Sequence, residues 1–207
     1  MTDDAPRLEA ERLSCSRGGR RLFSDIGFTL RSGEWLHVRG ANGAGKTSLL
    51  RLLAGLSTPD AGIVRWNGSA LPRSNDAFHD AVAYAGHRGA LKDDLTALEN
   101  LRLAAAIDGR PLDETSALVA LRRLGLQGRE DLPLRTLSAG QRRRVLLSRI
   151  AARDAVLWIL DEPLAALDSD AVDVVGSLVK DHLAGGGLAV ITSHQPLPLA
   201  PDCELAL

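Results

Sequence analysis

The sequence has few cysteines and few aromatic residues. Cysteine occurs only as Cys15 and Cys203, and aromatic side chains make up 3% of the 207 residues. The two cysteines lie far apart and form no C-x-x-C pair, so we expect reduced thiols, as in cytosolic proteins. So little aromatic surface also argues against a protein that stacks the bases of single-stranded nucleic acid.

The sequence also lacks an excess of one charge and any long hydrophobic run. Lys and Arg number 25 against 26 Asp and Glu, a net charge of −1, which argues against DNA or another nucleic acid as the main partner. No apolar run approaches the length of a membrane span, and residues 1–4 are acidic, so we expect neither a membrane-spanning helix nor a signal peptide. The hydrophobic content of 45% suits one globular domain, or a core with a lobe.

Residues 40–47 match the phosphate-binding loop pattern G-x-x-x-x-G-K-[ST] at every fixed position. Glycines at 40, 43 and 45 leave backbone N–H groups open to a triphosphate and permit positive φ. Lys46 would place a point charge on the β- and γ-phosphates, and the Thr47 hydroxyl would ligate Mg²⁺. The expected nucleotide-binding residues of this stretch are Gly40, Ala41, Asn42, Gly43, Ala44, Gly45, Lys46, Thr47 and Ser48.

The residues on either side of the loop support this interpretation. Residues 34–39 are predicted to form the strand before the loop, and residues 48–54 the helix after it, closed by Gly55. The helix would add its free N–H groups and the positive end of its dipole to the anion site. The sequence therefore predicts a nucleotide-binding protein.

The front of the chain is predicted to be antiparallel sheet. Residues 8–14 alternate weakly and are a plausible edge strand, and residues 22–30 lead toward the strand before the loop. Residues 63–66 form a short strand followed by Asn67-Gly68, a strong hairpin signal.

The middle of the chain has the pattern of helices. After a predicted strand at 81–85 that returns toward the nucleotide, Thr96 and Glu99 form a capping box that opens a helix through Ile107. A second helix begins at Asp113 and ends near Gly125. We therefore expect a single domain over residues 1–207, with a helical subdomain at about 90–135 inserted into an α/β core.

The second half of the chain supplies two buried strands with polar ends. Residues 156–160 are apolar without alternation, which is typical of a strand buried on both faces of a parallel sheet. This strand ends in Asp161 and Glu162, at the sheet edge where ligands of α/β folds bind. Asp161 would hold Mg²⁺ through water, and Glu162 would be the general base on the attacking water. After a helix at about 169–183, a last strand at 188–192 ends at His194, and only a short tail is expected to follow.

Together these motifs resemble the ATP-binding subunits of ATP-binding-cassette (ABC) transporters along essentially the whole chain. The stretch Leu137-Ser138-Ala139-Gly140-Gln141 is similar to the family signature LSGGQ, with alanine in place of the first glycine. Residues 165–168 match the D-loop of the family, and His194 matches its switch histidine, which contacts the γ-phosphate. The resemblance implies a P-loop ABC ATPase fold, with a mixed sheet and an inserted helical subdomain. It further implies catalytic roles for Glu162 and His194, ATP and Mg²⁺ as cofactors, and a homodimer in which Ser138 and Gly140 face the partner's γ-phosphate.

Two positions depart from the family pattern. His87 stands where the family usually has the glutamine of the Q-loop, which leaves open whether it ligates Mg²⁺ or couples to a transporter partner. The aromatic residue that normally stacks on adenine falls near Arg17. A guanidinium can also stack on a base, so Arg17 joins the expected nucleotide-binding residues.

A finer resemblance is to the ATPase subunits of haem exporters in cytochrome c maturation. It rests on Gly86-His87, on residues 95–101 and on the alanine in the signature. It implies a peripheral subunit on the cytoplasmic face of the bacterial inner membrane, bound to integral membrane subunits of the CcmB and CcmC type. No residue is a credible haem ligand, so haem is not expected to bind directly. The alternative is a soluble ABC-type ATPase that acts on ribosomes or DNA.

Overall fold

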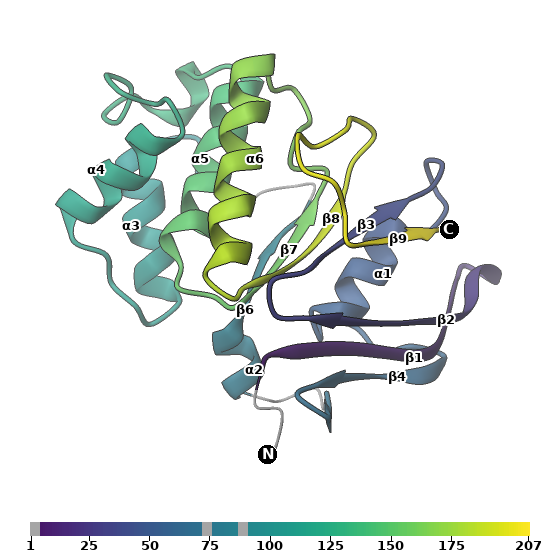
Figure 1. The fold of residues 1–207 in the computed structure, drawn as a ribbon. Helices are drawn as coiled ribbons and strands as arrows, with labels where there is room; N and C mark the ends of the chain where they lie inside the picture. The colour runs from purple at the N-terminus through teal and green to yellow at the C-terminus, as the bar shows by residue number, and fades with distance from the viewer. Residues whose placement is uncertain (1–4, 72–75, 87–90) are drawn as a thin grey trace.

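The chain folds into two sheets with helices between and beside them (Figure 1). The computed structural model describes residues 5–71, 76–86 and 91–207. One sheet is antiparallel with the order β2-β1-β4-β5, and the other is parallel with the order β6-β7-β8-β3-β9. The predicted fold class, a mixed α/β core with an antiparallel front section, is confirmed.

The antiparallel sheet is built from the first third of the chain. Its strands are β1 (Arg7–Arg17), β2 (Arg20–Arg31), β4 (Ala61–Trp66) and β5 (Ser69–Ala70). Asn67 and Gly68 both have positive φ, of 51° and 77°, which is the conformation of a two-residue type I′ turn. The predicted hairpin is therefore present, between β4 and β5.

The parallel sheet positions the ends of three strands next to one another. Its members are β3 (Trp35–Arg39), β6 (Val82–Ala85), β7 (Leu157–Asp161), β8 (Leu188–Thr192) and β9 (Cys203–Ala206). Every residue of β7 and β8 is buried, as expected for central strands of a parallel sheet. Asp161 pairs with Thr192 in the register of β7 and β8, and Thr192 pairs with Val38 of β3.

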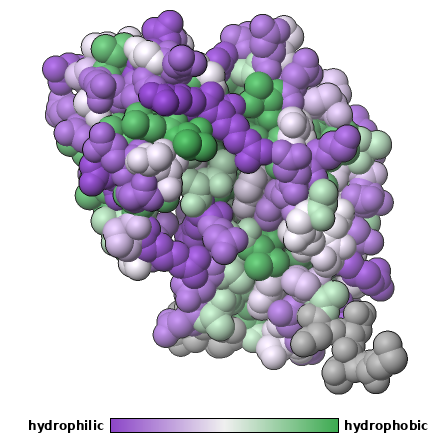
Figure 2. All heavy atoms as spheres, turned by 60° about the vertical axis from the view of Figure 1, so that its left-hand side comes forward, coloured by the Kyte–Doolittle hydropathy of each residue, from purple (hydrophilic) through white to green (hydrophobic). Residues whose placement is uncertain are grey.

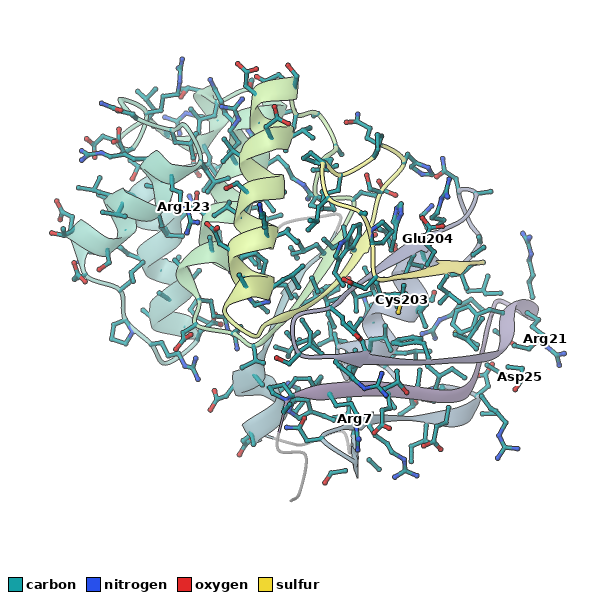
Figure 3. The ribbon with its side chains drawn as sticks, viewed as in Figure 1. Arg7, Arg21, Asp25, Arg123, Cys203 and Glu204 are labelled. Carbon is teal, nitrogen blue, oxygen red and sulfur yellow. The ribbon has the colours of Figure 1, made fainter. Side chains whose placement is uncertain are left out.

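Three elements differ from the prediction. Residues 8–14 were expected at the edge of a sheet, but β1 lies between β2 and β4 and pairs with both. The segment after His194 was expected to be only a tail, but it contains β9, which pairs in parallel with β3 and forms one edge of the sheet. In Figure 3, Cys203 points from β9 toward the core and Glu204 points away from it. The short helix α2 (Asp76–Ala81) before β6 was also not predicted. Both cysteines are free thiols, as expected.

The helices divide the buried side chains into three clusters. Leucines of α1 (Lys46–Leu53) fill the space between the two sheets, and α5 (Ala139–Ala152) and α6 (Ser169–Ala184) cover the other face of the parallel sheet (Figure 1). A third cluster joins α3 (Ala97–Ile107) and α4 (Glu114–Arg123) to the 3₁₀ turn Leu134–Thr136 and to α5. The helical subdomain at about 90–135 stays a prediction.

The starts of the two predicted helices are as expected. Thr96 and Glu99 form both bonds of the capping box at α3, and Asp113 caps α4 by accepting a bond from the Ser116 N–H. Across the described residues, no helix combines the length and the apolar character needed to span a membrane.

Candidate nucleotide site

The phosphate loop lies between β3 and α1, as the sequence predicts. Gly40, Gly43 and Gly45 have φ values of 153°, 81° and 109°, which favour glycine over residues with a side chain. Gly45 is the N-cap of α1 and supplies no side-chain capping bond. The N-terminal turn of α1 therefore offers backbone N–H groups to an anion rather than to a capping side chain.

Lys46 is the buried cation of the loop. Only 8% of its surface is exposed, and its Nζ donates to the Gly40 carbonyl at 2.8 Å. The same Nζ lies 3.8 Å from Glu162 Oε1. A lysine so buried needs anionic partners, and in this position it supplies the positive charge that a phosphate chain requires.

Asp161, at the end of β7, is fixed by two threonines. Its Oδ2 accepts a bond from the Thr47 hydroxyl at 2.7 Å, and its Oδ1 accepts one from the Thr192 hydroxyl at 2.9 Å. Thr192 Oγ1 in turn accepts the Glu162 N–H at 2.8 Å. One buried hydroxyl of β8 therefore orients both acidic residues that end β7.

Glu162 has an unusual backbone and a carboxylate with one oxygen that accepts no hydrogen bond from the described residues. Its φ is 51°, in the left-handed region that glutamate rarely adopts. Oε2 accepts the His194 N–H at 3.2 Å, while Oε1 is buried without a hydrogen bond. Oε1 lies within ion-pair distance of Lys46 Nζ and His194 Nε2 and keeps the acceptor capacity that a general base needs.

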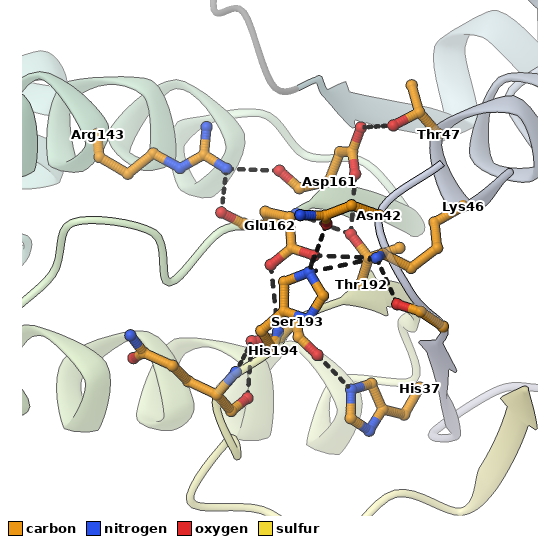
Figure 4. Close-up of polar contacts among 12 residues, drawn as sticks. His37, Asn42, Lys46, Thr47, Arg143, Asp161, Glu162, Thr192, Ser193 and His194 are labelled. Atoms are coloured by element: carbon orange, nitrogen blue, oxygen red, sulfur yellow. Dashed lines mark hydrogen bonds and ion pairs between the residues drawn. The ribbon is translucent and has the colours of Figure 1, made fainter. Parts of the chain in front are cut away.

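His194 completes the group from the end of β8 (Figure 4). Its Nε2 lies 3.1 Å from Asn42 Oδ1, 3.3 Å from Lys46 Nζ and 3.4 Å from Glu162 Oε1. The predicted loop residues, the acidic pair and the switch histidine thus meet at one place, although Asn42 and His194 are 152 residues apart in the chain.

These residues line a hollow of about 570 Å³, within the size range of small-molecule sites. Arg17 and Leu22 are also among the residues that line it. Within the described part of the chain, no aromatic side chain lines this hollow. The complete lining is Arg17, Leu22, Ala41, Asn42, Gly43, Gly45, Lys46, Thr47, Ser48, Asp161, Glu162, Ala165 and His194.

The donors present also fit Mg²⁺. The hydroxyl of Thr47 and the carboxylate of Asp161 are hard oxygen donors in direct contact. Within the described residues, no three His, Cys, Asp or Glu side chains form a metal cage. Mg²⁺ in nucleotide sites is commonly held by one or two protein oxygens together with phosphates and water. The Thr47 hydroxyl and the Asp161 carboxylate are a pair of that kind. His87, the doubtful metal position, lies outside the described residues.

Electrostatic effects extend to two neighbours of the site. Burial and the Asp161 carboxylate raise the pKa of the Tyr84 hydroxyl on β6. Burial lowers the pKa of the Arg143 guanidinium, while the charges of Asp161 and Glu162 oppose that shift. Arg143 therefore lies within the field of both acidic residues.

The signature residues lie away from this hollow. Ser138 and Gln141 form both bonds of a capping box at the start of α5, so their own N–H groups are satisfied within the helix. These two N–H groups at the start of α5 are therefore not free to bind an anion. Ala139 lines a separate hollow of about 490 Å³ with residues of the β7–α6 connection.

Sequence reasoning missed three residues that organise the site. Thr192 was noted only as the end of a strand, although a polar residue beside a strand that ends in Asp161 could have been recognised. His37 of β3 is within 3.2 Å of the Ser193 carbonyl through its Nε2, and Arg143 reaches the carbonyls of Asp161, Glu162 and Pro163. No sequence pattern points to these two contacts.

Comparisons with known proteins agree with this geometry. The ABC transporter family matches residues 23–165. The cytochrome c biogenesis ATP-binding export protein CcmA of Nitrosospira multiformis is 51% identical over 195 residues, covering 94% of this chain and 95% of that protein. A putative ABC transporter ATP-binding protein from Pyrococcus furiosus shares the fold, with a TM-score of 0.84, 23% identity and 97% of each chain covered. A dimeric ATP-binding cassette bound to ADP and phosphate superposes with a TM-score of 0.79 at 22% identity, over 91% of this chain and 88% of that one. The chain therefore belongs to the ABC transporter family, in its group of cytochrome c biogenesis ATP-binding export proteins.

Proposed function

We propose that this chain hydrolyses ATP as the motor subunit of an export complex for cytochrome c biogenesis, the haem exporter. The proposal is supported above all by the convergence of Lys46, Asp161, Glu162 and His194 on one hollow. The sequence identity of 51% to the CcmA protein favours this function over that of a soluble ATPase that acts on ribosomes or DNA.

Each residue of the site receives one role in the proposal. Lys46 and the N–H groups of the phosphate loop bind the triphosphate. Thr47 and Asp161 hold Mg²⁺, which when bound neutralises developing phosphate charge. Glu162 accepts the proton of the attacking water through Oε1, which accepts no hydrogen bond within the described residues. His194 contacts the γ-phosphate and steadies Glu162 through its backbone N–H.

The roles of Glu162 and Lys46 can be separated by experiment. Loss of a general base costs about 10²–10⁴ in rate, so Glu162→Gln should nearly stop turnover and keep ATP binding. Lys46→Ala should weaken binding itself, measured by equilibrium titration with labelled ATP. Glu11→Gln is the control, because Glu11 pairs with Arg65 on the antiparallel sheet. Parent-like hydrolysis by Glu162→Gln contradicts the assignment.

Two chains would form the active unit. The signature residues lie outside the nucleotide hollow of their own chain, so a second copy is the natural source of a signature facing the γ-phosphate. ATP should therefore promote dimers of the Glu162→Gln chain, and Ser138→Arg should abolish them. Light scattering in saturating Mg-ATP is the measurement, and a strictly monomeric Glu162→Gln chain counts against this arrangement.

The base of the nucleotide would rest on Arg17. A guanidinium stacked on a base contributes about 0.5–1 kcal/mol at an exposed site, less than an aromatic platform offers. Selectivity for adenine is therefore expected to be loose.

A groove beside the helical part would take the membrane partner. It has a volume of about 760 Å³ and is lined by Leu56, Tyr84 and Leu112 among others. Figure 2 shows hydrophobic side chains gathered among hydrophilic ones on this helical side of the molecule. An apolar groove with a charged rim suits a helix end of a partner, and would place the chain peripherally at the cytoplasmic face of the inner membrane.

The segment 86–94 joins β6 to the helical part of the chain and would be the coupling element, with Leu91 and Leu95 as its contacts. Residues 87–90 lie outside the described residues, and Leu91 packs partly buried against two core clusters. A charge at Leu91 would therefore disturb the core, and Leu56, which is 49% exposed, is the better test position.

Leu56→Glu should release the chain from membranes and leave ATP binding unchanged. Val119→Glu is the matched control, because Val119 is 60% exposed on α4 and does not line the groove. Membrane fractionation of cells that express each variant is the measurement. Equal membrane association of Leu56→Glu and parent would place the docking site elsewhere.

A further inference from the structure

The loop that carries the proposed base is held in a strained conformation. We define the β7–α6 loop as residues 162–168, between the end of β7 and the start of α6. Two of its residues, Glu162 and Ala166, have positive φ, of 51° and 64°. Residues with a side chain adopt this conformation only where surrounding contacts hold them in it.

Those contacts come from the first turns of α5, the helix that begins with the signature. Arg143 Nη2 donates to the carbonyls of Asp161 and Glu162, and its Nε donates to the Pro163 carbonyl at 3.2 Å. One guanidinium therefore binds three consecutive carbonyls across the strained residue, and Figure 4 shows its contacts with those of Asp161 and Glu162. The planar fork of arginine suits this task, and a lysine ammonium does not reproduce it.

Two further contacts attach the same loop to α5. A Cβ on Gly140 would lie 2.5 Å from the Ala166 carbonyl oxygen, so only glycine allows this approach. Arg144 Nη2 donates to both carboxylate oxygens of Asp168, at 2.8 and 2.7 Å. The loop and the start of α5 thus form one unit.

We propose that Arg143 is a positioning residue for ATP hydrolysis, which holds Glu162 in its strained conformation and links the signature helix to the base. The inference rests on the proposed role of Glu162. It follows that loss of the guanidinium should lower the rate of hydrolysis by displacing Glu162, while the phosphate loop keeps its affinity for ATP.

The decisive experiment is a double-mutant cycle that combines substitutions at Arg143 and Glu162. Arg143→Met keeps the aliphatic stem and removes the donors. It should lower kcat about 10- to 100-fold, as loss of an outer partner of a catalytic group commonly does, with the Kd for labelled ATP unchanged. In the Glu162→Gln background the same change should have no further effect in single-turnover hydrolysis, because the group it positions is already gone. Arg122→Met, on α4, controls for loss of an arginine ion pair.

Each outcome decides the proposal. Equal loss in both backgrounds, or a folded Arg143→Met chain with parent kcat, overturns it. If Arg143→Met does not fold, Arg143→Lys takes its place and should lower kcat with ATP affinity kept. Failure of both to fold makes Arg143 merely structural. Parent-like activity of Glu162→Gln would instead contradict the assignment of the base, so the two failures are distinguishable.

Discussion

The hydroxyl of Thr192 offers a sharp test of how the site is built. Thr192 is fully buried, donates to Asp161 Oδ1 and accepts from the Glu162 N–H. Thr192→Val keeps the shape of the side chain and removes only the hydroxyl. Two polar groups would then be left in the interior, a carboxylate oxygen without its donor and an N–H without its acceptor.

The size of the effect follows from these two bonds. A bond to a charged group contributes about 1.5–3 kcal/mol, and a buried polar group left unsatisfied costs about 1–3 kcal/mol. The extra methyl of valine recovers about 1 kcal/mol. The net loss of stability should therefore be about 2–4 kcal/mol, a large part of the roughly 5–15 kcal/mol that stabilises a typical domain.

Urea unfolding measures this loss. With a slope of about 3 kcal/mol per molar urea, the midpoint should fall by about 1 M. Thr192→Ser is the control, because it keeps the hydroxyl and loses a buried methyl worth about 1 kcal/mol. If the valine variant is no less stable than the serine variant, Thr192 does not organise the two acidic residues in the way described.

Three further predictions concern other parts of the chain. Burial lowers the pKa of His182 from the usual 6.5. The neutral imidazole therefore contributes its full stability above about pH 6.5, and this contribution is lost as the pH falls below that value. The urea midpoint should consequently fall less between about pH 7.5 and about pH 5.5 in His182→Gln than in the parent. A Cβ on Gly62 would lie 2.3 Å from the Arg12 carbonyl oxygen at a φ of 86°, so Gly62→Ala should cost about 2–4 kcal/mol by urea unfolding. Gly128→Ala, with equally positive φ but open space, should cost only about 1 kcal/mol. Arg17→Ala should weaken ATP binding about two- to fivefold by equilibrium titration, and binding unchanged by this variant would refute the proposed stacking.

Local patterns were enough to predict most of the fold. The phosphate loop is defined by glycines and by Lys46 within eight residues, and helix starts at Thr96 and Asp113 are encoded by their own capping side chains. β7 and β8 are apolar up to their last residues, Asp161 and Thr192, because both of their faces are covered. Each of these signals lies within one element, so the sequence alone reveals it.

The missed elements depend on contacts between distant segments. β9 has only four residues with a partly exposed alternating pattern, which on its own resembles a tail. It becomes a strand because the edge of β3 is free to pair with it, and the Leu207 N–H donates to the Arg39 carbonyl directly before the phosphate loop. Pairing with a partner more than 160 residues away leaves no local mark in the sequence.

The backbone of Glu162 shows most clearly why the site could be located but not fully built from sequence. A left-handed φ at a glutamate costs about 1–2 kcal/mol, so local preference argues against the conformation that the chain adopts. Arg143, 19 residues earlier, and Thr192, 30 residues later, supply the opposing bonds. The identity of the base follows from the strand that ends beside it, whereas its orientation follows from two residues that only the folded chain brings together. Substitutions at Arg143 and Thr192 should therefore impair hydrolysis more than nucleotide binding, although neither residue lies in the phosphate loop.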